Sequence, residues 1–486
     1  MELNKLLMAI TTASAMTLAA CGGSSSSSSS DDDNNGGTTP TTETGTFRAS
    51  TSSLAAGDAC ATVGTFSGLD IMSNGVYVPY CELKNTISAS VTLTTDFVYG
   101  LSGYITVGNG NGELEAYGDA SNVTLTVNEG VQFRSTGRGS LVISRGSMLN
   151  ANGTAANPIV MSSVDDGYDG QGEWGGLVVQ GLATNNQCEA EYAASPEEVC
   201  NTDDEAGTGF HGGNDDADSS GTITYLIVAE GGYEVAPDSE VNGITLHSVG
   251  YGTTIENVMV YNNADDGIEF FGGAANVKNL ILVDNGDESI DWDDGYHGNI
   301  QFALVRQGLV NEGDNGIEAD NKGLSNTAEP ISNPTLSNIT FQTGAEGSDH
   351  IASFKDGTMG TLEKIAADNY GNAIRLDDAE TMVTLSDILF EFSGSAMTVD
   401  SAASGSPNDQ LDGWDNTQTT QTVELGNAFE VTGGSASVSA STATSANAST
   451  GFFVETDYIG AVDPTVTAAE SAWWYWAASV VPAAFE

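Results

Sequence analysis

The densest set of carboxylates in the chain lies in a short acidic phrase that occurs three times. It reads Asp-Asp-Gly-Ile-Glu from residue 265, Asp-Glu-Ser-Ile-Asp from residue 287 and Asp-Asn-Gly-Ile-Glu from residue 314. Carboxylate oxygens are ligands for hard cations, and Ca²⁺ accepts about six to eight oxygens in irregular geometry. We therefore predict a Ca²⁺ site made by Asp265, Asp266, Glu269, Asp287, Glu288, Asp291, Asp314 and Glu318.

The same carboxylates have an alternative role that involves no specific cation. Two bare carboxylates about 5 Å apart repel each other by about 3 kcal/mol at an effective dielectric constant of about 20. Stacked carboxylates therefore need protonation, a bound cation or a splayed arrangement in water. Side chains that splay into water with diffuse counterions would form no site, and the residues alone leave both alternatives open.

A second group of residues in the same stretch has the types that acid–base chemistry requires. Asp291, Asp293 and Asp294 precede the phrase Gly-Tyr-His-Gly, which contains His297. They resemble the aspartates and the Gly-His-Gly phrase of galacturonan hydrolases, although the Arg-Ile-Lys phrase of those enzymes is missing and His297 follows Asp294 in the same turn. If the protein is an enzyme, we expect these four residues to be catalytic. The 12 Lys and Arg residues of the whole chain are few for a cleft that grips a polyuronate, which favours a non-catalytic role.

Aromatic residues accompany the acidic phrases and are candidates for ligand binding. Trp292 and Tyr296 lie in the middle phrase, and Phe271 follows the first one. Exposed aromatic rings can stack on sugar rings. We expect Trp292 and Tyr296 to bind a ligand in this way, and the alternative is that they pack inward.

The acidic phrase repeats together with a second phrase, and the two repeats indicate how these residues are positioned. Ile268, Ile290 and Ile317 are 22 and 27 residues apart. The second phrase begins with Asn at 257, 279, 299 and 338 and with Asp at 387, and mostly apolar residues follow. Such repeats indicate a solenoid, in which the chain returns to the same place after each turn. Strand-forming residues with Gly, Asn and Asp at the corners favour a β-solenoid.

In a β-solenoid, equivalent residues of successive turns stack about 4.8 Å apart. If the three isoleucines point inward, then Glu269, Asp291 and Glu318 point outward from one sheet. Arg375, in the phrase Asn-Ala-Ile-Arg, matches the position of Glu269 further along the chain. We expect Arg375 to end the acidic ladder by pairing with it.

The N-terminus has the features of an exported lipoprotein. Residues 1–20 have an early lysine, an apolar run and Leu-Ala-Ala before Cys21, as a signal peptide requires. The junction resembles a bacterial lipobox, which implies lipidation of Cys21, and the alternative is an ordinary signal peptide with a chance cysteine. Residues 21–46, rich in Gly, Ser, Asp and Thr, are expected to form a flexible lipidated tether. Gly after the cysteine resembles the sorting signal for the outer membrane, and we expect the body to face the cell exterior.

The rest of the chain divides by composition. Residues 47–121 are irregular and predicted to cap the N-terminal end, and regular winding is predicted over 122–450. Residues 185–220 interrupt the repeats with acidic runs and are expected to form a long loop on one face, where binding residues often lie. Residues 451–486 close the body, and the Trp-Trp-Tyr-Trp run from residue 473 is expected to plug the last turn. The alternative for this run is a membrane-facing or partner-binding patch.

The remaining cysteines and the net charge constrain the compartment and the partners. Cys60 lies near Cys81 and Cys188 near Cys200. Four cysteines allow three pairings, and we predict the near-neighbour pairing in an oxidising compartment. The formal net charge of −55 argues against nucleic acid and against membrane contact other than through the lipid anchor. Cations are the expected partners, unless the acidity serves only solubility.

Three segments of the chain resemble those of a known group of proteins. They are Leu-Val-Ile-Ser-Arg-Gly-Ser over 141–147, Ala-Asn-Gly-Thr-Ala-Ala-Asn-Pro-Ile-Val over 151–160 and Gly-Glu-Trp-Gly-Gly-Leu-Val-Val-Gln-Gly over 172–181. They resemble the opening of exported bacterial cell-surface lipoproteins with the pectin-lyase-like architecture, many without assigned function. The resemblance covers most of the chain after about residue 85. It implies an all-β fold, a single right-handed parallel β-helix with capped ends and a long loop insertion.

These observations lead to one expected function and one alternative. We expect a surface-exposed outer-membrane lipoprotein that acts as a non-catalytic ligand-binding or adhesive β-helix, assisted by Ca²⁺. Its partner would be a carbohydrate, another surface ligand or an outer-membrane receptor. The alternative, implied by the resemblance, is a polysaccharide lyase or glycoside hydrolase.

Overall fold

The computed structural model describes most of the chain beyond residue 45. The described residues are 46–51, 60–73, 75–165, 167–195, 198–204, 207–235, 240–310, 313–321, 325–344, 349–399, 410–412, 422–432 and 437–486. All of them belong to one unit, Gly45–Glu486. The expected signal peptide 1–20, Cys21 and all but the last residue of the expected tether 21–46 lie outside the described residues.

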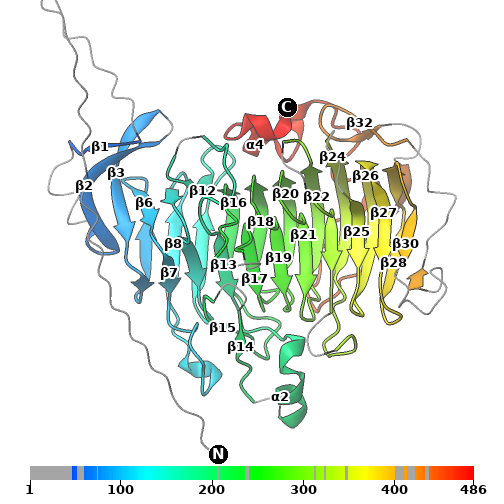
Figure 1. Cartoon of the computed structure of the whole chain (residues 1–486), viewed down its shortest axis with the longest axis horizontal. Coiled ribbons are helices and arrows are strands. Elements are labelled where there is room, and N and C mark those ends of the chain that lie inside the picture. The colour runs from blue at the N-terminus through cyan, green and yellow to red at the C-terminus, as the bar shows by residue number, and fades with distance from the viewer. Residues whose placement is uncertain are drawn as a thin grey trace, which may run out of the picture. The chain divides into compact units, whose positions relative to one another are not determined.

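An eleven-stranded parallel sheet forms one wall of the solenoid (Figure 1). Each strand between the two edge strands pairs in parallel with one strand from the preceding coil of the solenoid and one from the following coil, and we call each coil a rung. The strands are β4 (Thr86–Ile87), β7 (Tyr104–Val107), β10 (Ser140–Ile143), β13 (Leu177–Gln180), β17 (Ile244–His247), β19 (Ile268–Phe271), β21 (Ile290–Asp293), β23 (Ile317–Ala319), β25 (His350–Phe354), β27 (Asn372–Leu376) and β30 (Met397–Val399).

An eighteen-stranded sheet forms the remaining sides of the solenoid. Its first three strands pair antiparallel, and its later pairings are parallel. The strands are β1 (Phe47–Ala49), β2 (Gly64–Ser73), β3 (Val76–Leu83), β5 (Val91–Leu93), β6 (Val98–Leu101), β8 (Thr124–Asn128), β9 (Gln132–Ser135), β11 (Met148–Asn152), β12 (Ile159–Ser163), β16 (Gly221–Ala229), β18 (Thr254–Tyr261), β20 (Asn276–Val283), β22 (Asn299–Gln307), β24 (Thr335–Thr343), β26 (Met359–Tyr370), β28 (Met382–Ser386), β29 (Leu389–Phe392) and β31 (Leu411–Asp412).

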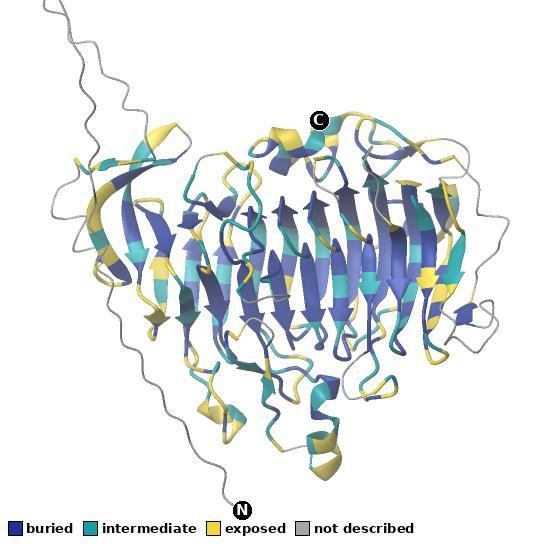
Figure 2. Cartoon of the chain, in the orientation of Figure 1, coloured by how far each residue is buried: buried dark blue, intermediate teal, exposed yellow. Residues whose placement is uncertain are grey.

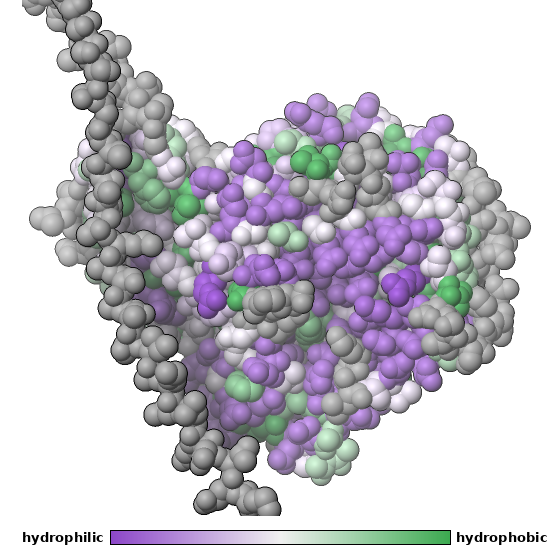
Figure 3. All heavy atoms as spheres, viewed as in Figure 1, coloured by the Kyte–Doolittle hydropathy of each residue, from purple (hydrophilic) through white to green (hydrophobic). Residues whose placement is uncertain are grey.

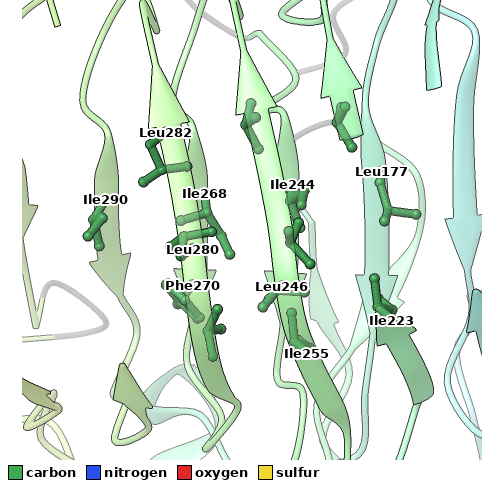
Figure 4. Close-up of a cluster of buried hydrophobic side chains, with 14 of the residues drawn as sticks. Leu177, Ile223, Ile244, Leu246, Ile255, Ile268, Phe270, Leu280, Leu282 and Ile290 are labelled. Atoms are coloured by element: carbon green, nitrogen blue, oxygen red, sulfur yellow. The ribbon is translucent and has the colours of Figure 1, made fainter. Parts of the chain in front are cut away.

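Apolar side chains from both sheets fill a single interior. Ile268 pairs with Ile290, and Ile290 pairs with Ile317. All three are buried in the core, which they share with residues such as Phe270 and Leu280 (Figure 4). The strands of the middle rungs are buried along most of their length, and exposed residues lie mainly at the two ends of the solenoid and in its longer loops (Figure 2). The predicted all-β parallel β-helix is confirmed, and so is the stack of isoleucines.

The second repeated phrase marks a left-handed residue inside the long strands. Asn257, Asn279 and Asn338 have φ angles of 56°, 58° and 58°. The ladder between β18 and β20 pairs the residues on either side of this position but not the asparagines themselves. Asparagine tolerates left-handed φ better than most residues. The phrase at residue 299 is out of register with the others, because Asn299 pairs with Asn276 and Phe302 occupies the left-handed position.

Parallel winding begins earlier than predicted. β4 pairs with β7, and β5 pairs with β8, so rungs form from about Thr86 and not from residue 122. Strands of two to four residues carry too short a pattern to be recognised in a sequence. The N-terminal cap is therefore smaller than 47–121 and consists mainly of antiparallel β1–β3. The predicted Cys60–Cys81 disulfide ties β3 to the residues before β2.

The insertion at 185–220 projects from one end of the strands of the eleven-stranded sheet (Figure 1). It contains η2 (Asn186–Cys188), α2 (Glu189–Ala194), β14 (Thr202–Asp203) and β15 (Phe210–His211). The predicted disulfide Cys188–Cys200 closes this segment. A further short helix, η1 (Tyr117–Asp119), lies between β7 and β8 in the chain.

The C-terminal segment covers the side of the solenoid, so the expectation that it plugs the last turn is wrong. Trp474 and Trp476 pack with outward-facing residues of β18, β20 and β22, namely Met259, Ile281 and Leu304. The outer face of these strands is apolar and requires a cover. The described parts of this segment are residues 422–432 and 437–486. They contain β32 (Glu424–Leu425), β33 (Val431–Thr432), β34 (Ser437–Ser441), β35 (Thr456–Tyr458), η4 (Ala469–Ser471), α4 (Tyr475–Ala478) and η5 (Pro482–Phe485).

The visible face of the molecule is largely polar. Hydrophilic residues cover a continuous area across its centre, and hydrophobic residues form small separate patches (Figure 3). This surface is consistent with the net charge of −55, which keeps such molecules apart in solution.

Replacement of Trp474 by alanine tests the role of the C-terminal cover. The indole packs against Phe429 and Phe485, with ring centroids 5.2 and 4.6 Å apart, and its Nε1 donates to Ala428 O over 2.9 Å. We expect Trp474→Ala to lower the free energy of unfolding by about 3–5 kcal/mol, measured by urea unfolding. Tyr475→Ala, at a side chain that is 39% exposed, should lower it by about 0.5 kcal/mol. Equal losses in the two variants would contradict the proposed cover.

Candidate functional site

The outward residues of three neighbouring rungs form an acidic ladder on the eleven-stranded sheet. Glu269 on β19 pairs in register with Asp291 on β21, which pairs with Glu318 on β23. The alternation of β-strands places them outward, because the isoleucines beside them are buried. The next two positions of the ladder are Ser353 and Arg375. The predicted stacking of the carboxylates is therefore present.

The corner before these strands adds a second row of carboxylates. Three groups have carboxylate oxygens within 4.8 Å of one another: Asp265 with Asp266 and Asp287, Asp266 with Glu269 and Asp291, and Asp287 with Glu288 and Asp314. Seven of the eight residues predicted as cation ligands thus lie together, and Glu318 continues the ladder beside them. We call these eight residues the acidic cluster.

Burial and mutual repulsion raise the pKa values of the acidic cluster. Burial is the main cause that raises the pKa of Glu288 to about 9, and the charges of Asp287 and Glu318 add to it. Burial also raises the pKa values of Asp266 and Asp291 well above their usual range, again with help from neighbouring carboxylates. These groups favour either a proton or a bound cation.

Hydrogen bonds satisfy part of the acidic cluster and leave one buried oxygen without a donor. Asn315 Nδ2 donates to Glu288 Oε1 over 2.7 Å, and the backbone N–H of Glu288 donates to Asp266 Oδ1 over 2.9 Å. Asn242 Nδ2 donates to Glu269 Oε2. Asp291 Oδ1 is buried and has no hydrogen-bond partner among the described residues. A buried carboxylate oxygen without a donor carries the full cost of desolvation.

Two adjoining cavities lie over this face of the sheet. One, of about 500 Å³, lies over the corner and is lined by residues of the acidic cluster. The other, of about 730 Å³, lies between the ladder and the insertion, and we call it the cleft. Glu269, Asp291 and Glu318 line both. The insertion contributes Glu191 and Asp204, among others, to the opposite wall of the cleft.

A buried arginine holds the insertion in place. Arg145 is fully buried, and its guanidinium donates to the carbonyl oxygens of Gly110, Gly112 and Cys200, each over 2.8 Å. Burial lowers its pKa to about 10. Five N–H donors in a fixed plane suit a site of several carbonyl oxygens. Arg145 on the solenoid therefore fixes the wall that the insertion supplies to the cleft, and the Cys188–Cys200 disulfide closes that wall internally.

One wall of the cleft carries a stack of three rings that the sequence analysis missed. His247 lies between His211 and Phe271, with ring centroids 4.6 and 4.7 Å away. Burial lowers the pKa of His247 to about 4, so its ring is neutral at pH 7. Neither ring nitrogen has a hydrogen-bond partner among the described residues. The register could have revealed His247, because it occupies the outward position of Phe271 and Asp293.

Lys355 pairs with the acidic ladder. Lys355 Nζ lies 2.7 Å from Glu318 Oε2 and 3.5 Å from Asp320 Oδ2. Arg375 Nη2 pairs with Asp377 Oδ2 on its own rung, over 2.7 Å. Ser353 separates Arg375 from Glu318 in the ladder. The charge of Arg375 acts on Asp314 at the corner, where it partly offsets the raised pKa of that carboxyl group. Lys355 follows the end of β25, a position that the repeated phrases do not mark.

The comparisons with known proteins bear on this architecture. Residues 85–450 match the family model described as a pectate-lyase-like β-helix domain. The chain belongs to this family. No curated protein and no solved structure matches the chain. Membership of the pectate-lyase-like β-helix family agrees with the stacked parallel strands and indicates no particular reaction.

The β-helix brings together three of the four residues expected in an enzyme. Asp291, Asp293 and Asp294 line the cleft, whereas His297 is not among the described residues that line it. The chain turns at Asp294, φ 54°, and Gly295, φ 86°, and so directs His297 elsewhere. His297 Nε2 lies 3.2 Å from Asp216 Oδ2 in the insertion. This contact raises the pKa of His297 against the effect of burial, and His297 in turn helps to lower the pKa of Asp216 to about 2.

The expected ligand-binding aromatics face the interior of the β-helix, so that expectation is wrong. Trp292 and Tyr296 are fully buried. Trp292 Nε1 donates to Thr358 Oγ1 over 3.0 Å, and Tyr296 OH donates to Ala275 O over 2.9 Å. Since Ile290 points inward, the alternation of the strand also turns Trp292 inward. Phe271, which follows β19's inward Phe270, is the aromatic residue that lines the cleft.

A fourth group of carboxylates lies outside the acidic cluster. Asp165, Asp169 and Glu230 have oxygens within 4.8 Å of one another. Glu230 is fully buried and accepts hydrogen bonds from Ser162 Oγ, 2.7 Å, and from the backbone N–H of Ser163, 3.2 Å. No repeated phrase marks this group, because its members do not recur along the chain.

The raised pKa values predict that the metal-free protein loses stability as the pH rises from about 5 to about 9. The pKa is about 9 for Glu288 and about 8 for Asp320 in the folded state, against about 4 in an unfolded chain. In this range the folded state holds protons that the unfolded state has released, so stability falls with rising pH. Melting curves in EDTA measure this dependence.

Matched variants identify the groups responsible. Glu288→Gln and Asp320→Asn should each make the melting temperature less dependent on pH, because an amide does not titrate. Glu113→Gln, at an exposed carboxylate, should leave the dependence as it is. If both buried-site variants keep the full pH dependence of the melting temperature, then Glu288 and Asp320 do not cause it.

Proposed function

We propose that the protein is a cation-dependent binding protein whose acidic cluster holds divalent cations and whose cleft captures a ligand without catalysis. The observation that carries this proposal is the acidic cluster itself, in which three sets of carboxylates each have oxygens within 4.8 Å of one another. The cluster shares Asp291 with the cleft, and the buried Oδ1 of Asp291 has no hydrogen-bond partner among the described residues. A cation at the cluster offsets the repulsion that otherwise protonates it. The cation also cross-links carboxylates of neighbouring rungs, which makes the outer face of the sheet more rigid.

The donor set favours Ca²⁺ over other divalent ions. The three groups contain only carboxylates, and hard oxygen donors suit Ca²⁺ and Mg²⁺ better than zinc or copper. Carboxylates from successive rungs give an irregular arrangement with more donors than Mg²⁺ needs in its octahedral shell. A bound Ca²⁺ also accepts hydroxyl or carboxylate oxygens of a ligand as further donors. Asp265, Asp266, Asp287, Glu288 and Asp314 are the residues that would hold the first ion.

A binding role fits the cleft better than a catalytic role. The single lysine that lines it among the described residues, Lys355, is paired with Glu318 and Asp320. His297, the expected proton carrier, is paired with Asp216. Proton transfer requires a group within hydrogen-bond reach of the substrate. A polysaccharide lyase or glycoside hydrolase remains the alternative, since Asp291, Asp293 and Asp294 line the same cleft.

We also propose export and attachment to the outer membrane through a lipid on Cys21, with the body facing the exterior. Two disulfides support an oxidising compartment. Among the described residues, no helix is long and apolar enough to cross a bilayer. A tethered rigid solenoid suits capture or adhesion at a cell surface, with a carbohydrate, another surface ligand or an outer-membrane receptor as the partner.

Melting curves with and without Ca²⁺ test the cation proposal. The full chain in EDTA should gain melting temperature when Ca²⁺ is added in excess, because a ligand at about 100 times its dissociation constant stabilises the folded state by about 2.7 kcal/mol. Asp287→Asn should remove most of this gain, since Asp287 belongs to two of the three carboxylate groups. Glu113→Gln should keep all of it.

Two outcomes would contradict the proposed function. The first is an identical melting temperature in EDTA and in Ca²⁺, which would leave the acidic cluster as a solvated surface. The second is turnover of a polysaccharide that is lost in Asp291→Asn or Asp294→Asn while the melting temperature stays unchanged, which would make the protein an enzyme.

A further inference from the structure

The charge of the cleft restricts the ligand that it can take. Nine carboxyl side chains line it, against one lysine, among the residues that the structure describes. Like charges at close range in a partly desolvated cavity repel strongly. A polyanion such as a polyuronate would therefore be repelled over its whole length. The ligand must bring positive charge of its own or carry it in as a bound metal ion.

Lys355 shows how the cleft binds an ammonium group. Its Nζ lies 2.7 Å from Glu318 Oε2 and 3.5 Å from Asp320 Oδ2, so one ammonium bridges two carboxylates that are two residues apart on one rung. Asp291 and Asp293 repeat this spacing on the preceding rung, and Asp291 is the register partner of Glu318. Both aspartates line the cleft. The preceding rung therefore presents a second pair of the same kind, with a buried oxygen of Asp291 that no described residue donates to.

His247 provides the second observation that points to a ligand. It is 1% exposed, lines the cleft, and has two ring nitrogens without a hydrogen-bond partner among the described residues. A neutral imidazole can accept a hydrogen bond from one hydroxyl at one ring nitrogen and donate a hydrogen bond from the other to a second oxygen. Its ring lies against Phe271, which occupies the same register position on the next rung and is half-buried in the wall of the cleft. Aromatic faces attract cations and stack on sugar rings.

We propose that the cleft binds an oligosaccharide of amino sugars, with one ammonium group between Asp291 and Asp293 and the adjoining sugar ring beside Phe271 and His247. This inference rests on the binding role proposed above for the cleft. A sugar ring supplies the hydroxyl groups that satisfy His247 and an apolar face for Phe271, whereas a linear polyamine supplies neither. The ammonium group supplies positive charge that balances the negative charge of the carboxylates.

Calorimetric titration of the full chain with a glucosamine oligosaccharide tests the inference. The fully N-acetylated oligosaccharide of the same length is the matched control ligand, since acetylation removes the charge and keeps the sugar. We expect saturable binding of the glucosamine oligosaccharide and at least tenfold weaker binding of its acetylated form. Spermine, which has ammonium groups without sugar rings, should also bind at least tenfold more weakly.

Three variants separate the roles of the residues. Asp293→Asn should weaken binding of the glucosamine oligosaccharide at least tenfold but retain the Ca²⁺-dependent gain in melting temperature, because Asp293 lies outside the three carboxylate groups of the acidic cluster. Asp287→Asn, outside the cleft, should lose most of the Ca²⁺-dependent gain in melting temperature, and in EDTA it should bind the glucosamine oligosaccharide as tightly as the wild type does. Lys355→Met should leave binding unchanged or strengthen it, because it releases Glu318 and Asp320 for a further ammonium group. An anionic ligand would instead depend on Lys355.

Several results would overturn the inference. They are equal affinity for the acetylated and free amino sugars, equal affinity for spermine, loss of binding in Lys355→Met with an unchanged melting temperature, and binding of polygalacturonate in place of glucosamine. Absence of glucosamine binding in a protein that Ca²⁺ still stabilises would overturn the ligand class and leave the cation proposal standing. Absence of both responses would overturn both.

Discussion

The in-register stacking of rungs is the constraint on which the rest of the structure depends. A parallel ladder places equivalent residues of successive rungs about 4.8 Å apart, and the strand alternation fixes which of them face inward. For Ile268, Ile290 and Ile317 this stacking produces a continuous apolar core. For Glu269, Asp291 and Glu318, one position further along the chain, the same geometry holds carboxylates close together. Their mutual repulsion opposes folding. The core and the acidic cluster are thus two faces of one repeat.

The electrostatics of the acidic cluster follow from this geometry. Backbone hydrogen bonds of the ladder fix the spacing, so the side chains cannot separate fully without breaking the register. Glu288 and Asp266 at the corner are buried by the turns of the neighbouring rungs, and their pKa values rise in consequence. The ladder ends where the chain provides a cation, at Lys355, one rung after Glu318. A cation, from the chain or from outside, is therefore what each rung of this face needs in order to ionise fully.

The sequence predicted the features that recur and missed those that do not. The isoleucine stack and seven of the acidic ligands in close groups follow from phrases that repeat every 22 or 27 residues. Trp292 was predicted to face solvent although its spacing from Ile290 turns it inward. His211, Lys355 and the C-terminal cover come from the insertion, a strand end and a segment outside the repeats. Their positions depend on tertiary packing, for which a single sequence holds no periodic signal.

The use of the few cations in this chain explains why positive charge in the cleft has to come largely from a ligand. Of 12 Lys and Arg residues, several are buried and bound to backbone carbonyls. Arg145 holds the insertion, and Arg306 and Lys364 hold the C-terminal segment through the carbonyl oxygens of Ala484 and Thr456. A cation used to fix a loop is not available to neutralise the outer face. The fold therefore employs its own cations to build the walls of the cleft, and the cleft keeps an excess of negative charge that a cationic ligand or a metal ion can relieve.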